Sequence, residues 1–222
     1  MEIIEDYPKG KALDFPAGWG RLSYWLQQKG HDVVACDVAP EKYTDSPIHL
    51  TKADLTKKFP FDDNTFDYAF CIDGPEHSEN IYHTFREFHR VLKHDGILIT
   101  SIPNFSNIES RFKQFWYGVL EPINSYEDFQ RCYPVTGHMH VNRPSYALLK
   151  MAIEGSGLKV TAVNYDKEKQ AQKYFYPLYL LIRMITYLKG DKGQKKYWLR
   201  DSNSKNVLMG GNTLIIVSKK QQ

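Results

Sequence analysis

The chain has 222 residues, of which 42% are hydrophobic and 25% are charged, and its formal net charge at pH 7 is +3. These values are typical of a globular protein with a full hydrophobic core, and a single domain over residues 1–222 is expected. The small net charge does not indicate a nucleic-acid partner, so none is expected. The sequence leaves the oligomeric state open.

The N-terminal segment and the cysteines exclude further classes. The segment MEIIEDYPKGK lacks the basic and then apolar order of a signal peptide, and no apolar run reaches the roughly 20 residues that cross a bilayer. The three cysteines, Cys36, Cys71 and Cys132, are widely spaced, and two lie in apolar strand-like runs. This pattern indicates buried thiols and not a disulfide framework, so a cytoplasmic protein is expected.

Strand-like and helix-like segments alternate along the chain. Strands are predicted at 11–15, 32–37, 48–54, 66–72, 97–102, 158–163 and 212–220. Helices are predicted at 20–29, 79–94 and 144–155, the first ending at Gly30 and the second followed by a turn at Asp95-Gly96. The early alternation indicates βαβ units and therefore an α/β fold with a mainly parallel, doubly wound sheet.

Two segments, 105–143 and 166–211, are longer than the connections that alternating strands and helices require. If the last strand runs antiparallel to its neighbour, both segments leave the sheet at the carboxyl ends of the parallel strands. Open α/β sheets bind their ligands at that edge. The segments are therefore predicted to be lid or ligand-pocket elements that form a cap on one domain. The alternative is two surface decorations, although long structured insertions are usually functional.

The stretch DFPAGWG, residues 14–20, places a carboxylate, a loop of small residues and a helix N-terminus in succession. Gly18 and Gly20, with Asp37 about 20 residues beyond the loop, resemble a dinucleotide fingerprint, but this signal alone is weak. Asp14 separates the candidate ligands, because a carboxylate at the strand end would repel the phosphates of a dinucleotide. It suits S-adenosylmethionine, which carries an ammonium and a sulfonium group but no phosphate. The carboxylate of that cofactor could lie at the helix N-terminus.

Four stretches, ALDFPAGWGRLS, ADLTKKFPFDDNTFDYAFCIDGPEHSEN, FREFHRVLKHDGILITSIPN and GHMHVNRPSYALLKMAIEGSGLKV, occur in this order between about Lys11 and Val163. Together they resemble the class I S-adenosylmethionine-dependent methyltransferases, of the type-11 group that includes ubiquinone-biosynthesis enzymes. An ordered match of this extent is far more specific than any single motif. The resemblance implies a seven-stranded, Rossmann-like sheet with an antiparallel last strand.

The resemblance also implies a cofactor site at the ends of the early strands. The residues expected around S-adenosylmethionine are Asp14, Pro16, Ala17, Gly18, Gly20, Asp37, Asp54, Leu55 and Ile72. Asp14, Gly18 and Gly20 would surround its methionine part, and Asp37 would accept hydrogen bonds from the ribose hydroxyls. Asp54 and Leu55 would meet the adenine edge. Taken alone, Asp37 would be interpreted as a strand-end turn residue and Asp54-Leu55 as a common dipeptide.

The chain departs from the family pattern at three places. Pro16 replaces the first glycine of the loop, and Trp19 is bulky where a small residue is usual. Asp73-Gly74-Pro75 replaces an acidic and then apolar run before Glu76-His77. None of these changes removes a cofactor-facing acid. They leave open the alternative of a methyltransferase-like binding protein without turnover, while an NAD(P)-dependent oxidoreductase is disfavoured by Asp14.

Three histidines are candidate catalytic residues: His77, His138 and His140. A sulfonium is already an activated methyl donor, so positioning dominates, and a hydroxyl acceptor would gain from a base such as one of these imidazoles. His77 could instead cap the following helix or hold Glu76. His138 and His140 resemble a metal pair, but no acid is near them in the sequence, so no metal site is expected. O-methylation of a small-molecule, glycan or lipid-linked acceptor is favoured.

A last apolar stripe begins near Pro177, which suits the start of a helix. It comprises Leu178, Leu181, Ile182, Ile185 and Leu188 at helical spacing. The stripe is expected to pack against the sheet or the other insertion. The alternative is a peripheral contact with the inner face of a membrane through 174–200, because tyrosines and lysines flank the stripe.

Overall fold

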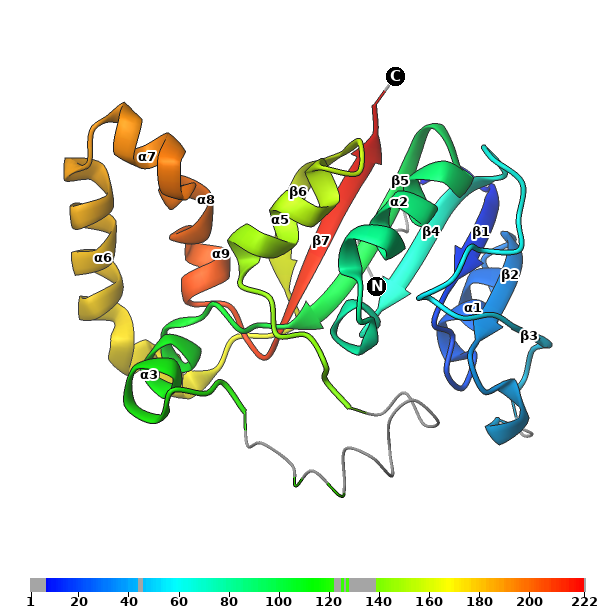
Figure 1. Ribbon diagram of the computed structural model, residues 1–222, viewed down its shortest axis with the longest axis horizontal. Helices are drawn as coiled ribbons and strands as arrows, with labels where there is room; N and C mark the ends of the chain where they lie inside the picture. Colours follow the sequence, from blue (N-terminus) through cyan, green and yellow to red (C-terminus); the bar gives the residue numbers. More distant parts are fainter. Residues whose placement is uncertain (1–6, 44–45, 122–124, 126, 128–138, 222) are drawn as a thin grey trace.

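The computed structural model describes residues 7–43, 46–121, 125, 127 and 139–221. The described strands are β1 (Lys11–Asp14), β2 (Asp32–Asp37), β3 (Leu50–Lys52), β4 (Phe66–Ile72), β5 (Leu92–Pro103), β6 (Leu158–Tyr165) and β7 (Thr213–Lys220). They form one seven-stranded sheet in the order β3-β2-β1-β4-β5-β7-β6 (Figure 1). Strands β1 to β5 pair in parallel, and β7 is antiparallel to both of its neighbours, β5 and β6. The predicted fold class is confirmed.

The helices in the described part of the chain include the three that were predicted, at 20–29, 79–94 and 144–155. They are α1 (Arg21–Gln28), α2 (Ile81–Val91), α3 (Ile108–Tyr117), α5 (Tyr146–Glu154), α6 (Tyr176–Leu188), α7 (Asp191–Tyr197), α8 (Leu199–Ser202) and α9 (Lys205–Leu208). Short 3₁₀ turns lie at η2 (Pro40–Lys42), η3 (Pro75–His77) and η4 (Gln170–Phe175). Helix α2 starts later than predicted because the Asn80 side chain caps it, accepting from His83 N at 3.0 Å.

Strand β5 starts at Leu92, directly after α2, so Asp95-Gly96 lies inside the strand and not in a turn before it. Asp95 has a φ of 63°, and the pairing of β5 with β4 shifts register between Phe66 and Tyr68. The Asp-Gly pair thus marks an irregularity in the strand. Strand β3 is also shorter than the predicted 48–54, covering only Leu50–Lys52.

Apolar side chains cover both faces of the sheet. On one face, Phe85 and Phe88 of α2 and Ile153 of α5 are fully buried in a core shared with alternate residues of the strands. On the other face, Leu26 of α1 packs with Phe70 of β4. This arrangement explains why β4 is almost continuously apolar. Cys36 and Cys71 are buried free thiols, as expected from their place in the strands.

Both insertions leave the sheet at the carboxyl edge of the parallel strands, as predicted, because β5 and β6 run in the same direction. Helix α3 follows the end of β5, whereas α6 lies at the end of the molecule opposite β3 (Figure 1). Helix α9 joins the second insertion to the sheet, since Asn206 Nδ2 donates to Val163 O at 2.7 Å. The cap itself stays a prediction.

The apolar stripe of α6 does not pack as expected. Leu181, Ile185 and Leu188 are 45%, 48% and 78% exposed, so the predicted packing is wrong for these side chains. The buried face of α6 is instead polar: Thr186 accepts a hydrogen bond from Asn203 at 2.8 Å, and its carbonyl accepts one from Gln194 at 2.6 Å. None of the described helices is both long and apolar enough to cross a membrane.

Candidate functional site

The loop between β1 and α1 lies across the end of β2. Ala17 N donates to Cys36 O at 2.8 Å, and Gly18 N donates to a carboxylate oxygen of Asp37 at 3.0 Å. Gly20 then starts α1 with a φ of 68°. A side chain at Gly20 would clash, because its Cβ would lie 2.5 Å from a methyl group of Ile48. The local sequence thus holds the helix N-terminus close to two strand ends.

Asp14 is a buried carboxylate at the end of β1, only 1% exposed. Ser23 Oγ donates to its Oδ2 at 2.6 Å, while Oδ1 has no hydrogen-bond partner among the described residues. Burial raises the pKa of Asp14 to about 7. A buried carboxylate with an unpaired oxygen costs free energy unless a cation or donor meets it. The position therefore suits an ammonium or sulfonium group.

Asp37 lies at the end of β2 and is 4% exposed. One of its oxygens accepts from Gly18 N, and the other accepts from Ala39 N at 3.1 Å. Each carboxylate oxygen can accept a further hydrogen bond, so the predicted ribose contact is compatible with this geometry.

Trp19 does not fill the inside of the loop. It is 50% exposed, and its ring lies edge-on to Tyr43 with centroids 5.2 Å apart. Burial, with a smaller contribution from the charge of Asp37, raises the pKa of Tyr43. Trp19 and Tyr43 therefore form an aromatic wall near Asp37 and leave the contact between Gly18 and Asp37 intact.

Asp54 and Leu55 follow β3. Ala53 N donates to Asp37 O at 2.9 Å, which brings this turn beside the end of β2. Asp54 Oδ1 accepts from the backbone and hydroxyl of Thr56, at 2.9 and 2.7 Å, and Leu55 is buried. Ile72, at the end of β4, is half-buried. Their contact with a cofactor stays a prediction.

Pro16 and Gly74 are packed against each other, which relates two of the departures noted in the sequence. A Cβ at Gly74 would lie 2.6 Å from Pro16 Cδ and 2.8 Å from Cys71 Sγ. The proline ring in the loop after β1 therefore requires the absence of a side chain after β4. The loop after β1 and the turn η3 are in direct contact through this pair.

Turn η3 places Glu76 and His77 at the carboxyl end of β4. His77 Nδ1 lies 3.0 Å from Met139 O, and the rings of His77 and His140 have centroids 5.0 Å apart. His140 Nδ1 lies 3.0 Å from a Glu121 oxygen. The structure thus brings two of the three predicted histidines together. The third, His138, lies outside the described residues.

Glu76 is the site residue that the sequence analysis did not include. It is fully buried, and neither carboxylate oxygen has a hydrogen-bond partner within the described part of the chain. Burial, together with the charges of Asp73 and Glu121, raises its pKa to about 8. Its place directly before His77, after an apolar strand, was the available signal. No acid lies near His140 in the sequence, but the fold brings the Glu76 carboxylate close to it from a distant segment.

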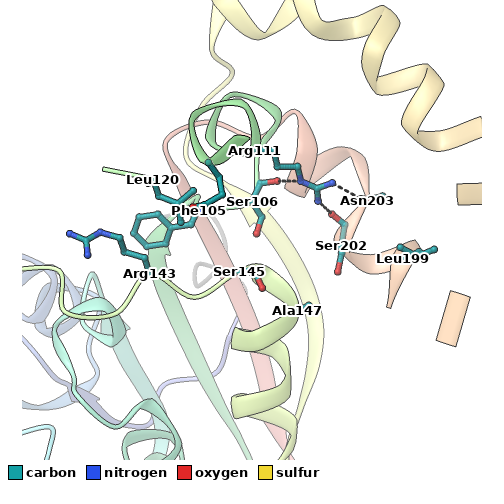
Figure 2. A pocket seen from close by; sticks show the side chains of 11 residues that line it. Phe105, Ser106, Arg111, Leu120, Arg143, Ser145, Ala147, Leu199, Ser202 and Asn203 are labelled. Carbon is teal, nitrogen blue, oxygen red and sulfur yellow. Dashed lines mark hydrogen bonds between the residues drawn. The ribbon is translucent and has the colours of Figure 1, made fainter. Parts of the chain in front are cut away.

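A cavity of about 510 Å³ lies where the two insertions meet the start of α5. Leu199 and Ser202 of the second insertion line it together with Ser106 and Arg111 of the first (Figure 2). Arg111 ties the two insertions together, because its guanidinium donates to Ser106 O, Ser202 O and Asn203 Oδ1 at 2.8–2.9 Å.

The cavity adjoins the histidine pair. Phe105, which lines it, has its ring centroid 6.3 Å from that of His140. Arg143 also lines it and donates to the same Glu121 oxygen that faces His140, at 2.9 Å. The histidines therefore lie between the cavity on one side and η3, which contacts the loop after β1, on the other.

Comparison with known proteins identifies the domain. Residues 13–100 match the type-11 family model that is described as a methyltransferase domain. Over these residues the chain is similar to the class I S-adenosylmethionine-dependent methyltransferases, which supports the resemblance seen in the sequence. The matched residues run from β1 to β5 and include the loop, both strand-end acids and the Glu76-His77 pair. S-adenosylmethionine is thus the cofactor of the family.

The chain also matches two curated proteins over part of their length. It is 27% identical over 115 residues to the putative methyltransferase YqeM of Bacillus subtilis, covering 47% of each chain. It is 30% identical over 79 residues to the ribosomal RNA small subunit methyltransferase C of Idiomarina loihiensis, covering 34% of this chain and 24% of the relative. The chain thus spans about half of one relative and about a quarter of the other.

A solved structure shares the whole fold. An S-adenosylmethionine-dependent methyltransferase from Archaeoglobus fulgidus matches with a TM-score of 0.62 and 16% identity, over 99% of this chain and 90% of that one. At this identity the likeness shows the fold alone. It extends beyond the family model to the strands of the C-terminal half.

Proposed function

We propose that this methyltransferase transfers the methyl group of S-adenosylmethionine to a hydroxyl group of a small-molecule, glycan or lipid-linked acceptor. The observation that carries the donor half is Asp14, whose buried carboxylate has an oxygen without a partner among the described residues. The carboxylate lies beside the N-terminus of α1, so the cationic and anionic groups of the methionine part both find complementary charge.

The acceptor half rests on the histidine pair. In the reaction, an oxygen lone pair of the acceptor forms a bond to the methyl carbon while the carbon–sulfur bond breaks, and its electrons remain on sulfur. The hydroxyl proton passes to a neighbouring lone pair. His77 and His140 each hold Nδ1 against an oxygen acceptor, which leaves the lone pair on Nε2 in the neutral ring. Holding donor and acceptor in line supplies most of the remaining acceleration.

The cavity between the insertions supports a small acceptor or the end of a larger one. Its volume of about 510 Å³ suits a ligand of that size, and it adjoins His140. One relative is named as a ribosomal RNA methyltransferase, but the match covers only 24% of it. The net charge of +3 gives little attraction for RNA, so a small or glycan-like acceptor is the better-supported proposal.

The donor site is tested by isothermal titration with S-adenosylmethionine and S-adenosylhomocysteine. Asp37→Ala is expected to weaken binding by about tenfold to a hundredfold, since a charge-assisted hydrogen bond contributes about 1.5–3 kcal/mol. Asp32→Ala, at the exposed start of the same strand, is the matched control and should bind like the wild type. A folded wild type that gives no heat with either ligand but binds NAD would overturn the proposal.

Turnover is measured as release of S-adenosylhomocysteine with a panel of acceptors that carry hydroxyl, carboxyl or amine groups. The proposal expects release with a hydroxyl acceptor. Release only with an amine or carboxyl acceptor would contradict O-methylation but keep the donor site. Cofactor binding without release for any acceptor would favour a binding protein.

We further propose that α6 contacts an anionic membrane surface, where a lipid-linked acceptor would be found. Leu181, Ile185 and Leu188 are exposed, and Lys189, Lys192, Lys195 and Lys196 follow them. Binding to vesicles of phosphatidylglycerol is expected to fall by more than about tenfold in the double variant Leu181→Glu/Ile185→Glu, because about 2 kcal/mol of apolar burial is lost. Co-sedimentation measures it. Leu148→Glu, at a 40% exposed position of α5, is the control. Equal sedimentation of all variants contradicts the proposal.

A further inference from the structure

We propose that Glu76, His77 and His140 bind a divalent transition-metal ion. Each of the three side chains offers one ligand atom, and these atoms all lie within 4.8 Å of one another. Neighbouring ligands of a metal held at about 2.1 Å are about 3.0–3.4 Å apart, so a small inward movement of the three side chains completes the site.

The hydrogen bonds of both imidazoles fix the nitrogen that faces the metal. A carbonyl oxygen only accepts, so His77 Nδ1 carries the hydrogen that it donates to Met139 O at 3.0 Å. His140 Nδ1 likewise donates to the Glu121 carboxylate at 3.0 Å. In each ring Nε2 therefore carries the lone pair. Histidine ligands of metals are usually held in this way, by a carbonyl or a carboxylate on the other nitrogen.

Glu76 provides an independent observation. Its side chain is fully buried, and neither carboxylate oxygen has a hydrogen-bond partner within the described residues. A buried charge is retained in proteins when it is paired or when it coordinates a metal. No described cation is placed against Glu76, whereas two imidazoles meet its end. A metal ion would supply the missing partner for the Glu76 oxygen that faces the two imidazoles.

The segment that carries His140 is held firmly beside η3. Asn142 N donates to Glu76 O at 2.9 Å, and the Asn142 side chain donates to Ser78 O. Phe105 packs edge-on against the His140 ring, with centroids 6.3 Å apart. The ligands therefore come from two segments, distant in sequence, that the backbone already aligns. Such preorganisation reduces the entropy lost when the ion binds.

The ligand set selects the kind of ion. Two imidazoles and one carboxylate favour Mn²⁺, Fe²⁺, Co²⁺ or Zn²⁺ over Mg²⁺ and Ca²⁺, which prefer oxygen ligands. Three protein ligands leave coordination positions open. Resting on the proposed function, the open positions would take the acceptor hydroxyl, whose pKa falls on coordination to the ion. The metal would then replace a histidine as the means of ionising the acceptor.

The test uses the full chain, stripped with EDTA, dialysed and titrated with Co²⁺ and Zn²⁺. Visible absorption of bound Co²⁺ and calorimetry with Zn²⁺ are expected to show one equivalent. Glu76→Gln and His140→Ala should each weaken binding at least tenfold, and Glu121→Gln should do so by about tenfold as an orienting partner. His94→Ala, an exposed histidine on β5, is the control and should leave both titrations unchanged.

S-adenosylhomocysteine is titrated into the same samples. Retained binding shows that a variant is folded, and it separates the two proposals. If the wild type binds S-adenosylhomocysteine but takes up no Co²⁺ or Zn²⁺, the metal site is wrong and the donor site stands. Metal uptake without binding of S-adenosylhomocysteine would support the metal site and contradict the donor site. If metal binding survives in both Glu76→Gln and His140→Ala, the ion lies elsewhere and the inference is overturned.

Discussion

Asp14→Asn is expected to weaken the binding of S-adenosylmethionine at about pH 8 by at least tenfold, while stabilising the ligand-free protein. The substitution keeps an oxygen that accepts from Ser23 Oγ, which lies 2.6 Å from Asp14 Oδ2. It removes the negative charge that faces the cationic ligand. It also removes the cost of ionising a buried acid, because burial raises the pKa of Asp14 from 3.8 to about 7. At a pH above 7 this cost is about 4 kcal/mol.

The sign of the pH dependence follows from the protons bound in each state. Between about pH 4 and pH 7 the folded protein keeps the Asp14 proton and the unfolded chain has released it. The free energy of unfolding therefore falls as the pH rises through this window. The stabilisation by Asp14→Asn should be small at about pH 4 and large at about pH 8. In the wild type, cofactor affinity should rise with pH through about 7, as Asp14 ionises.

Urea denaturation at both pH values, with calorimetry of cofactor binding, measures the two effects. Asp32→Asn, on the exposed start of β2, is the matched control and should change neither. The same difference in stability at low and high pH would show that Asp14 does not titrate as described. An unchanged cofactor affinity would remove Asp14 from the donor site.

Arg111→Ala is expected to destabilise the protein by about 3 kcal/mol and to raise the KM for the acceptor. The partly buried guanidinium donates to three oxygens, two of them carbonyls of Ser106 and Ser202 and one the side-chain oxygen of Asn203. Truncation leaves these acceptors without their donor, and each buried unpaired group costs about 1–3 kcal/mol. Since Arg111 joins the two insertions, the cavity between them should lose its shape.

Urea denaturation and initial rates with the acceptor check this result. Arg111→Lys should recover only part of the stability, because an ammonium group cannot reproduce the planar set of donors. Lys113→Ala, which removes an ion pair with Glu109 on the same helix, should change stability by less than about 0.5 kcal/mol. Acceptor KM unchanged in a stable Arg111→Ala protein would contradict the placement of the acceptor in this cavity.

The strands were predictable where burial is set by the sheet itself. The ranges of β2 and β4 match the prediction at both ends, because an apolar run marks each strand: VVAC between two aspartates in β2, and the nearly continuous apolar residues of β4. The start of α2 was missed because the Asn80 cap fixes the first helical residue at Ile81, two residues after the predicted start at Glu79. The α6 stripe was misjudged for a different reason: helical spacing shows that a face is apolar but does not show what covers it.

The candidate site was predictable in part. The order of Asp14, the glycines and Asp37 is local, and the structure brings them together through backbone hydrogen bonds. Glu76 was missed because its lack of partners is a tertiary property, which arises only when distant segments exclude water from it. The same holds for its meeting with His140. Glu76 and His140 are far apart in the sequence, so the sequence did not show that a carboxylate lies near this histidine.

Gly74 has a thermodynamic consequence for the two halves of the site. Because the missing Cβ would lie 2.6 Å from Pro16 Cδ, the loop beside Asp14 and the turn that carries His77 cannot move independently. Ligands on the two sides are therefore expected to be coupled, and coupling of binding free energies is reciprocal. Whatever factor the cofactor imposes on affinity at His77, a ligand at His77 imposes on the cofactor. When the donor loses its methyl group, the affinity of the site at His77 for the methylated product is therefore expected to change.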